Sequence, residues 1–226
     1  VLLLIPSLVN KANILDLMPQ RSLLRWLAKQ GMQAYLLDWG EPITDEAMKD
    51  IPGLMKKRLV PAIEYLSKRH VPIHVLGYCM GGTLAAGAAA LVPQHVKSLT
   101  FLAAPWDFHG GSKALLNRVK FWAPSASPLI KDRGYLPVDW MQTVFASLDP
   151  ESTAQKFAKF AEMDQGSLDA KIFVAVEDWL NDGVDLPAAL AREPIDEWFM
   201  ENKPAKGKWS IGKTIINARS IKAPSL

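Results

Sequence analysis

Gly77-Tyr-Cys-Met-Gly-Gly82 is the segment that decides the fold. It directly follows the apolar stretch Ile73-His-Val-Leu76 and leads into Gly81–Leu91, whose many Ala and Leu residues predict a helix. A Gly-x-nucleophile-x-Gly sequence between a strand and a helix is typical of a nucleophile elbow, a sharp turn that presents one reactive side chain. Glycine is needed on both sides because a side chain there would collide with the strand or the helix. Cys79 is therefore the predicted nucleophile.

The surroundings of Cys79 suit this role. It lies at the N-terminus of the predicted helix, where unpaired backbone N–H groups stabilise an anion such as a thiolate. The N–H of Met80 points into the same space, which makes it a candidate oxyanion-hole donor. The second donor is expected from the loop Pro6-Ser-Leu-Val-Asn10 after the first strand, with the N–H of Val9 as the candidate. The structural alternatives are a buried cysteine in a glycine-rich turn and a loop that only connects two elements.

Strands and helices alternate through the first 104 residues. Short apolar stretches predict four strands, and segments with helical spacing or composition lie between them. The strands are Val1–Ile5, Gln33–Trp39, Ile73–Leu76 and Val96–Ala103, and the helices are Leu15–Gln30, Pro61–Arg69 and Gly81–Leu91. This alternation predicts βαβ units and a parallel sheet with helices on both faces. Residues 1–104 are therefore predicted to be the first part of the core.

The alternation stops after Ala104. Residues 105–208 contain five of the eight tryptophans and are predicted to form a mainly helical cap. Within them, Ile172-Phe-Val-Ala-Val176 has strand propensity, but its setting favours a helix. Residues 209–226 are predicted to return to the core through a hairpin at Trp209–Asn217 and to lead into the next core strand. The chain is accordingly expected to be truncated at both ends.

The composition excludes several classes of function. The 226 residues are 49% hydrophobic, enough for a domain with a sizeable core. The 26 basic and 23 acidic residues are mixed along the chain, which is not the pattern of a nucleic-acid binder. The single cysteine excludes an internal disulfide. No stretch approaches the roughly 18 apolar residues of a membrane span, and no signal peptide is visible. A cytoplasmic protein without a metal or cofactor is expected.

A cysteine nucleophile needs a base, and in this type of fold an acid and then a histidine follow the nucleophile along the chain. The four histidines are His70, His74, His95 and His109. The first two precede the nucleophile, and His95 lies at the far end of the nucleophile helix. His109 comes before any strand that would supply the acid. The Asp and His of the triad are therefore expected beyond Leu226, and this chain alone is expected to be inactive in turnover.

Several segments resemble the polyhydroxyalkanoate synthases, a family of the α/β-hydrolase superfamily. Pro6–Leu17 resembles their P-x-x-[IV]-N-[KR] loop and the [IL]-x-D-L segment after it. Tyr35–Pro42 is similar to a strand and its following loop in the short synthases that work with a second subunit. The elbow has the family's cysteine where most hydrolases have serine. Three further segments match in order: Ala104–Phe108 resembles the opening of the cap, Glu177–Asp182 its E-x-W motif, and Gly212–Pro224 the hairpin before the next core strand.

The resemblance implies an α/β-hydrolase fold with a helical cap inserted after the strand that follows the nucleophile helix. It also implies an acyltransferase that polymerises (R)-3-hydroxyacyl-CoA, carries the growing chain as a thioester on Cys79 and releases CoA. Asn10 and Tyr78 are candidate substrate-binding residues. The partners implied are the acyl-CoA, the polyester chain, and a second copy or a second synthase subunit. The surface of a polyester granule is an expected location.

Other classes of function stay open. A cysteine hydrolase similar to the dienelactone hydrolases also uses a G-Y-C-x-G-G elbow, but that family lacks both the long insertion and the P-x-x-V-N-K loop. A thioesterase-like hydrolase on the same scaffold is a related alternative. The non-catalytic alternative is a granule-associated protein that kept the fold and lost the reaction.

Overall fold

The central sheet has four parallel strands. The computed structural model describes residues 1–69, 73–111, 113–147 and 150–226, so His70 lies outside the described residues. The strands lie in the order β4 (Ala34–Leu36), β1 (Leu2–Ile5), β5 (His74–Tyr78) and β6 (Ser98–Leu102). All four predicted strands are therefore confirmed, and the pairs β1–β4, β1–β5 and β5–β6 are all parallel.

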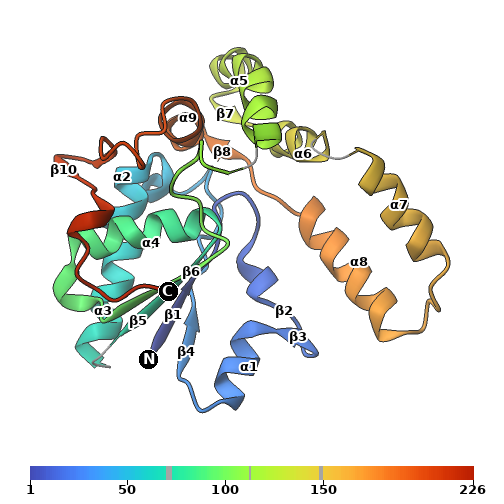
Figure 1. The fold of residues 1–226 in the computed structure, drawn as a ribbon, viewed down its shortest axis with the longest axis horizontal. Coiled ribbons are helices and arrows are strands. Elements are labelled where there is room, and N and C mark those ends of the chain that lie inside the picture. Colours follow the sequence, from blue (N-terminus) through green and yellow to red (C-terminus); the bar gives the residue numbers. More distant parts are fainter. Residues whose placement is uncertain (70–72, 112, 148–149) are drawn as a thin grey trace.

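Helices cover both faces of this sheet (Figure 1). The core helices are α1 (Leu23–Lys29), α2 (Ile51–Leu54), the π-helix η3 (Met55–Leu59), α3 (Val60–Arg69) and α4 (Met80–Leu91), with short 3-10 turns η2 (Glu46–Met48) and η4 (Pro93–His95). Alternate residues of β1 point to opposite faces: Leu3 and Ile5 join the larger apolar cluster with α2–α4, whereas Leu4 joins a smaller cluster with α1. The predicted βαβ arrangement is confirmed.

The predicted helix from Leu15 to Gln30 is wrong in its first half. The 3-10 helix η1 (Ala12–Leu15) leads into the hairpin strands β2 (Asp16–Met18) and β3 (Arg21–Ser22), and α1 begins only at Leu23. The Ser22 hydroxyl accepts a hydrogen bond from the N–H of Arg25 at 2.9 Å and so caps the helix there. Pro19 also disfavours helical backbone in the residue before it.

The stretch from residue 113 to residue 200 is mainly helical. It contains α5 (Lys113–Arg133), α6 (Val138–Ala146), α7 (Pro150–Ala161), α8 (Leu168–Asn181), α9 (Ala188–Arg192) and the π-helix η5 (Glu193–Met200), with a two-stranded ribbon of β7 (Tyr135–Leu136) and β8 (Leu186–Pro187). None of its described residues joins the central sheet. Residues 172–176 lie inside α8, so the helix predicted there is confirmed. Among the described residues, no helix combines the length and the hydropathy needed to cross a bilayer.

The last residues return to the sheet. The strands β9 (Ser210–Ile211) and β10 (Thr214–Ile215) form the predicted hairpin, and the 3-10 helix η6 (Ala218–Ser220) follows. Beyond it, the N–H of Leu99 in β6 donates to the carbonyl of Pro224 at 2.9 Å, and the N–H of Leu226 donates to the carbonyl of Leu99 at 3.1 Å. The chain thus runs parallel to β6 at its end. The division at residues 104 and 208 stays a prediction.

A partly buried carboxyl group joins the helical stretch 113–200, called the cap below, to the returning segment. The indole N–H of Trp209, a fully buried side chain, donates to Oε1 of Glu193 in η5 at 2.8 Å. Burial raises the pKa of Glu193 from 4.5 to about 7, and the nearby carboxylates of Glu197 and Asp50 act in the same direction. The folded state therefore binds this proton more tightly than the unfolded state, so stability is lost as the pH rises from about 4.5 to about 7.

The Glu193→Gln variant is expected to be more stable than the unmodified chain at pH 8 and equal to it at pH 4. Glutamine keeps the acceptor for Trp209 and carries no charge, so the gain at pH 8 is expected to be about 1–3 kcal/mol. Urea unfolding at both pH values measures it, with Glu162→Gln on the exposed surface as the control. A stability difference that does not change with pH would contradict the assignment.

Candidate active site at the carboxyl ends of β1 and β5

Cys79 occupies a strained turn between β5 and α4. Its backbone has φ 53° and ψ −130°, a region that residues other than glycine rarely adopt. The N–H of Cys79 donates to the carbonyl of Leu102 at the end of β6 at 2.9 Å, and its carbonyl accepts from the N–H of Gly82 at 2.9 Å. Both the neighbouring strand and the following helix therefore hold the turn in this conformation. Backbone strain of this kind is concentrated at functional sites.

Three glycines allow this turn to form. A Cβ atom on Gly77 would overlap the backbone of Gly82, and one on Gly82 would overlap the Cβ of Ala104. A Cβ atom on Gly81 would overlap the carbonyl oxygens of Ile5 and Pro6. Each of these contacts would be shorter than the contacts that Cβ atoms have in proteins. The glycines of the elbow are thus needed for contact between the nucleophile helix, the sheet and the loop after β1.

The loop after β1 is held over the N-terminus of α4. The buried indole of Trp39 donates from Nε1 to the carbonyl of Ser7 at 3.0 Å and, more weakly, to that of Pro6 at 3.3 Å. β1 pairs with β4 on one side and with β5 on the other, so the strand order reverses at this point. Ligands of open α/β sheets bind at the carboxyl ends of strands where the order reverses.

A cavity of about 300 Å³ opens at this position. Its core side is formed by Cys79, Met80 and Val9, the predicted nucleophile and the residues of the two predicted oxyanion donors. Its cap side is formed by residues of α5, α6, α9 and η5 and by one residue each from β7 and β8. The structure therefore brings the three predicted residues together, and their chemical roles stay predictions.

The two predicted substrate-binding residues do not line this cavity. Tyr78 lies beside the nucleophile in sequence, but its side chain packs in the smaller apolar cluster on the α1 face of the sheet. Burial is the main cause that raises the pKa of Tyr78, and the charge of Cys79 adds to it. The amide of Asn10 donates from Nδ2 to the carbonyls of Trp179 and Leu180, each at 3.3 Å. Their role in substrate binding remains a prediction.

Asn10 belongs to a set of contacts that attach α8 to the core. The indole of Trp179 donates to the carbonyl of Lys11 at 2.8 Å, and the Nζ of Lys11 lies 2.7 Å from Oδ1 of Asp182. The N–H of Val184 donates to the carbonyl of Val9 at 3.2 Å. Figure 1 shows α7 and α8 projecting away from the other helices, so these contacts hold the base of a protruding pair. Two segments quoted for the resemblance, 6–17 and 177–182, meet here.

The histidines that the structure describes form hydrogen bonds with groups other than Cys79. The Nε2 of His109 donates to the carbonyl of Phe199 at 2.7 Å. The Nδ1 of His74 lies 2.6 Å from the hydroxyl of Ser98, and the Nδ1 of His95 lies 2.8 Å from that of Ser67. Of the residues placed by the structure, no histidine lines the cavity that contains Cys79. The prediction that His109 is not the base is consistent with this arrangement.

Sequence reasoning missed Asp107 as a cavity residue. It has the only carboxylate among the described residues that line the cavity. Its Oδ1 accepts from the side-chain amide of Asn202 at 2.7 Å and from the N–H of His109 at 3.0 Å. These hydrogen bonds, the first above all, lower the pKa of Asp107 below its usual value. Its position just after β6, at the same edge of the sheet as Cys79, was the available signal.

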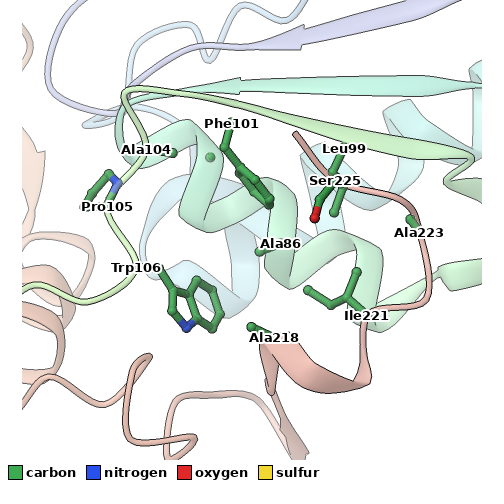
Figure 2. A pocket seen from close by; sticks show the side chains of 11 residues that line it. Ala86, Leu99, Phe101, Ala104, Pro105, Trp106, Ala218, Ile221, Ala223 and Ser225 are labelled. Atoms are coloured by element: carbon green, nitrogen blue, oxygen red, sulfur yellow. The ribbon is translucent and has the colours of Figure 1, made fainter.

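A second cavity, of about 210 Å³, lies between α4, β6 and the last residues of the chain. Figure 2 shows the side chains of Phe101, Trp106 and Ile221 around it, with Ser225 on the segment beside β6. Cys79 is not among the residues that line this cavity. Cys79, the predicted nucleophile, therefore lines the first cavity and not this one.

Comparisons with known proteins agree with this fold. The model of the alpha/beta hydrolase fold family matches residues 67–182. Over its whole length the chain is 28% identical to the poly(3-hydroxyalkanoate) polymerase subunit PhaC of Haloferax mediterranei and covers 46% of that protein. It is 26% identical to the subunit of the same name from Thiocystis violacea, of which it covers 64%. With the Synechocystis sp. subunit, 99% of the chain aligns at 27% identity and covers 61% of that protein. The chain thus spans between about half and two thirds of these curated relatives.

Proposed function

Because this chain belongs to the α/β-hydrolase fold family, we propose that it is the acyl-transfer part of a polyhydroxyalkanoate synthase. The Sγ of Cys79 attacks the thioester carbonyl of a (R)-3-hydroxyacyl-CoA, the C–S bond to CoA breaks, and the acyl group remains on Cys79 as a new thioester. The hydroxyl of another unit then attacks this thioester, which forms an ester bond and frees the thiol. The observation that carries the proposal is the strained Cys79 turn at the wall of a cavity.

The same geometry supports an oxyanion hole. Met80 is the first residue of α4, and the loop that carries Val9 is held against the N-terminus of that helix. Two backbone N–H groups in these positions would stabilise the negative charge that develops on the thioester oxygen. One such donor is typically worth 10²–10³-fold in rate. Met80 and Val9 therefore keep their proposed roles.

The apolar wall of the cavity favours transfer to a hydroxyl over transfer to water. Asp107 is the single ionisable side chain beside Cys79 among the described residues of the wall. A site of this composition holds water poorly and suits an acyl chain. This separates the proposal from the cysteine-hydrolase alternative, which needs a bound water. Strained backbone is concentrated at functional sites, and the non-catalytic alternative gives no reason for the strain at Cys79.

The polyester product implies partners and a location. A polymer of 3-hydroxyacyl units is insoluble in water, so the synthase is proposed to work at the surface of the polymer granule. A second copy of the chain or a second synthase subunit is proposed as a protein partner. The relatives described above are named as polymerase subunits, which supports a partner subunit.

A single-turnover experiment tests the function. The chain is mixed with 3-hydroxybutyryl-CoA, and the acyl group on Cys79 is followed by mass spectrometry while the released CoA is titrated. One acyl group and one CoA per chain are expected, without further turnover, because the described histidines bind elsewhere. Loss of general-base assistance typically costs 10²–10⁴-fold. A sample alkylated beforehand with iodoacetamide is the control.

The products distinguish the alternatives. An acyl group that stays on Cys79, and that leaves only slowly as an ester of two hydroxybutyrate units, supports the polymerase. Free hydroxybutyrate in an amount equal to the released CoA would favour a hydrolase. Sustained turnover by this chain would contradict the prediction that the chain lacks its general base. His109 would then become the candidate for that base. Absence of any acyl group on Cys79 would argue against the proposed function.

A further inference from the structure

The proposed oxyanion loop, residues 6–11, is held at two places. The buried indole of Trp39 donates to the carbonyl of Ser7 at 3.0 Å. Further along the loop, the carbonyl of Val9 accepts from the N–H of Val184, just beyond α8, at 3.2 Å. The N–H of Val9, the proposed oxyanion donor, belongs to a peptide group between these two carbonyls. Because each peptide group is planar, fixing both neighbours restricts the direction of this N–H.

The second attachment of the loop is built from both sides. The Nδ2 of Asn10 donates to the carbonyls of Trp179 and Leu180 at the end of α8, each at 3.3 Å. In return, the indole N–H of Trp179 donates to the carbonyl of Lys11 at 2.8 Å. Asn10 also forms an isolated antiparallel bridge with Gly183. A shift of the loop relative to the end of α8 would break all of these contacts.

The segment after α8 fits closely between the loop and α6. A Cβ atom on Gly183 would overlap Cγ2 of Val138 and would lie 3.2 Å from the carbonyl oxygen of Val9. The N–H of Val138, the first residue of α6, donates to Oδ1 of Asp185 at 2.8 Å. The end of α8 is thus fixed to the cap on one side and to the oxyanion loop on the other.

Two side chains are central to this attachment. Asn10 and Trp179 are partly buried, and both bind main-chain carbonyls, so their hydrogen bonds fix the path of the backbone itself. The ion pair of Lys11 with Asp182 at 2.7 Å adds less, because the two side chains are 43% and 53% exposed and water screens such pairs. Asn10 does not line the cavity that contains Cys79. Any effect of Asn10 on the reaction is therefore expected through the loop.

Resting on the proposed function, we infer that Asn10 and Trp179 are positioning residues that hold the N–H of Val9 in place for the oxyanion. When the Sγ of Cys79 attacks a carbonyl carbon, the carbonyl oxygen gains a negative charge and accepts hydrogen bonds from the N–H groups of Val9 and Met80. Loss of one such donor typically costs 10²–10³-fold in rate. Loosening the loop displaces the donor without removing it, so a loss of at least about tenfold is expected. The same contacts make the oxyanion hole depend on the docking of α8.

The first arm of the test compares two reactions of Cys79 that differ in their need for an oxyanion hole. With 4-nitrophenyl acetate, the Sγ attacks the ester carbonyl, an oxyanion forms, and 4-nitrophenolate leaves as the thioester is made. With iodoacetamide, the Sγ displaces iodide from a CH₂ group and no oxyanion forms. Cys79 is the only cysteine, so peptide masses report both reactions at this residue. The ratio of the two rates cancels changes in the exposure or ionisation of the thiol.

Two variants loosen the loop. Asn10→Leu keeps a branched side chain of similar size and removes the amide donor, and Trp179→Phe removes the indole N–H. Both are expected to lower the ratio of acylation to alkylation at least about tenfold, while the iodoacetamide rate stays the same. Gln142→Leu is the matched control with an unchanged ratio, because Nε2 of Gln142 donates to the same carbonyl of Leu180, at 3.2 Å, from α6 and not from the loop. An unchanged ratio in Asn10→Leu and Trp179→Phe, whatever their urea midpoints, would overturn the inference.

The second arm follows acylation by 3-hydroxybutyryl-CoA in the single-turnover assay, and it separates the inference from the proposed function. Both variants are expected to be acylated at least about tenfold more slowly than the unmodified chain. A loss with this thioester alone, at an unchanged ratio for the acetate, would overturn the positioning role and make Asn10 a substrate-binding residue. An unmodified chain that the thioester does not acylate, together with lowered ratios for the acetate, would keep the positioning role and refute the proposed function. If Asn10→Leu does not fold, Trp179→Phe decides.

Discussion

The Cys79→Ala variant is expected to transfer the acyl group of 3-hydroxyacyl-CoA at least about 10⁴-fold more slowly than the unmodified chain. No thioester forms without the sulfur, and oxyanion donors alone give only a small residual rate over the background. The measurement is CoA release in the single-turnover assay, together with the mass of the protein. CoA release that continued at the original rate would remove Cys79 from the mechanism.

The fold of this variant serves as its control. Alanine has the same Cβ and a smaller side chain, so the turn at φ 53° is as strained as with cysteine. The urea midpoint is therefore expected to stay close to that of the unmodified chain. Cys79→Ser is the matched second variant, because it keeps the shape and replaces the thiol by a weaker nucleophile. If both variants lose activity while the urea midpoint stays unchanged, the loss comes from the missing thiol and not from a change in the fold.

The Gly81→Ala variant is expected to lose at least about 3 kcal/mol of stability or to fail to fold. The added Cβ would overlap two backbone carbonyl oxygens, those of Ile5 and Pro6. Neither can move easily, since Ile5 ends a central strand and Pro6 lies in the loop that the Trp39 indole holds. Urea unfolding followed by tryptophan fluorescence measures the loss.

Gly166→Ala is the matched control for this substitution. The nearest atom to a Cβ at Gly166 is Oδ1 of Asp164 at 3.4 Å, and its backbone is not in the left-handed region. A change within about 1 kcal/mol is expected there. A Gly81→Ala protein with the stability of the unmodified chain would mean that the loop after β1 does not lie against the elbow.

Local sequence was sufficient to predict the elbow. The motif Gly-x-Cys-x-Gly-Gly stands between a strand and a helix. The sharp turn and the glycines that it requires lie within the same six residues, so the sequence alone predicts the turn. The strands and the helix at 172–176 were predictable for a similar reason, since apolar stretches and helical setting act over a few neighbours. The first half of the helix predicted at 15–30 failed because two local signals outweigh the helical spacing, Pro19 and the capping residue Ser22. The partly exposed pairing of Asp16 with Arg25 at 2.8 Å then joins β2 to α1.

The sequence by itself thus predicted Cys79 as the nucleophile, and it determined the parallel sheet and the helical character of the stretch from residue 113 to residue 200. Tertiary structure alone decided which side chains share a cavity with Cys79. Val119, Met141 and Leu186 are far apart in sequence and line this cavity only because α5, α6 and the β7–β8 ribbon fold over it. The tertiary structure also decided that the side chain of Asn10 binds the end of α8 and that His109 binds a backbone carbonyl. Burial and hydrogen bonding between distant segments determine where these side chains point, and no short-range sequence pattern encodes this.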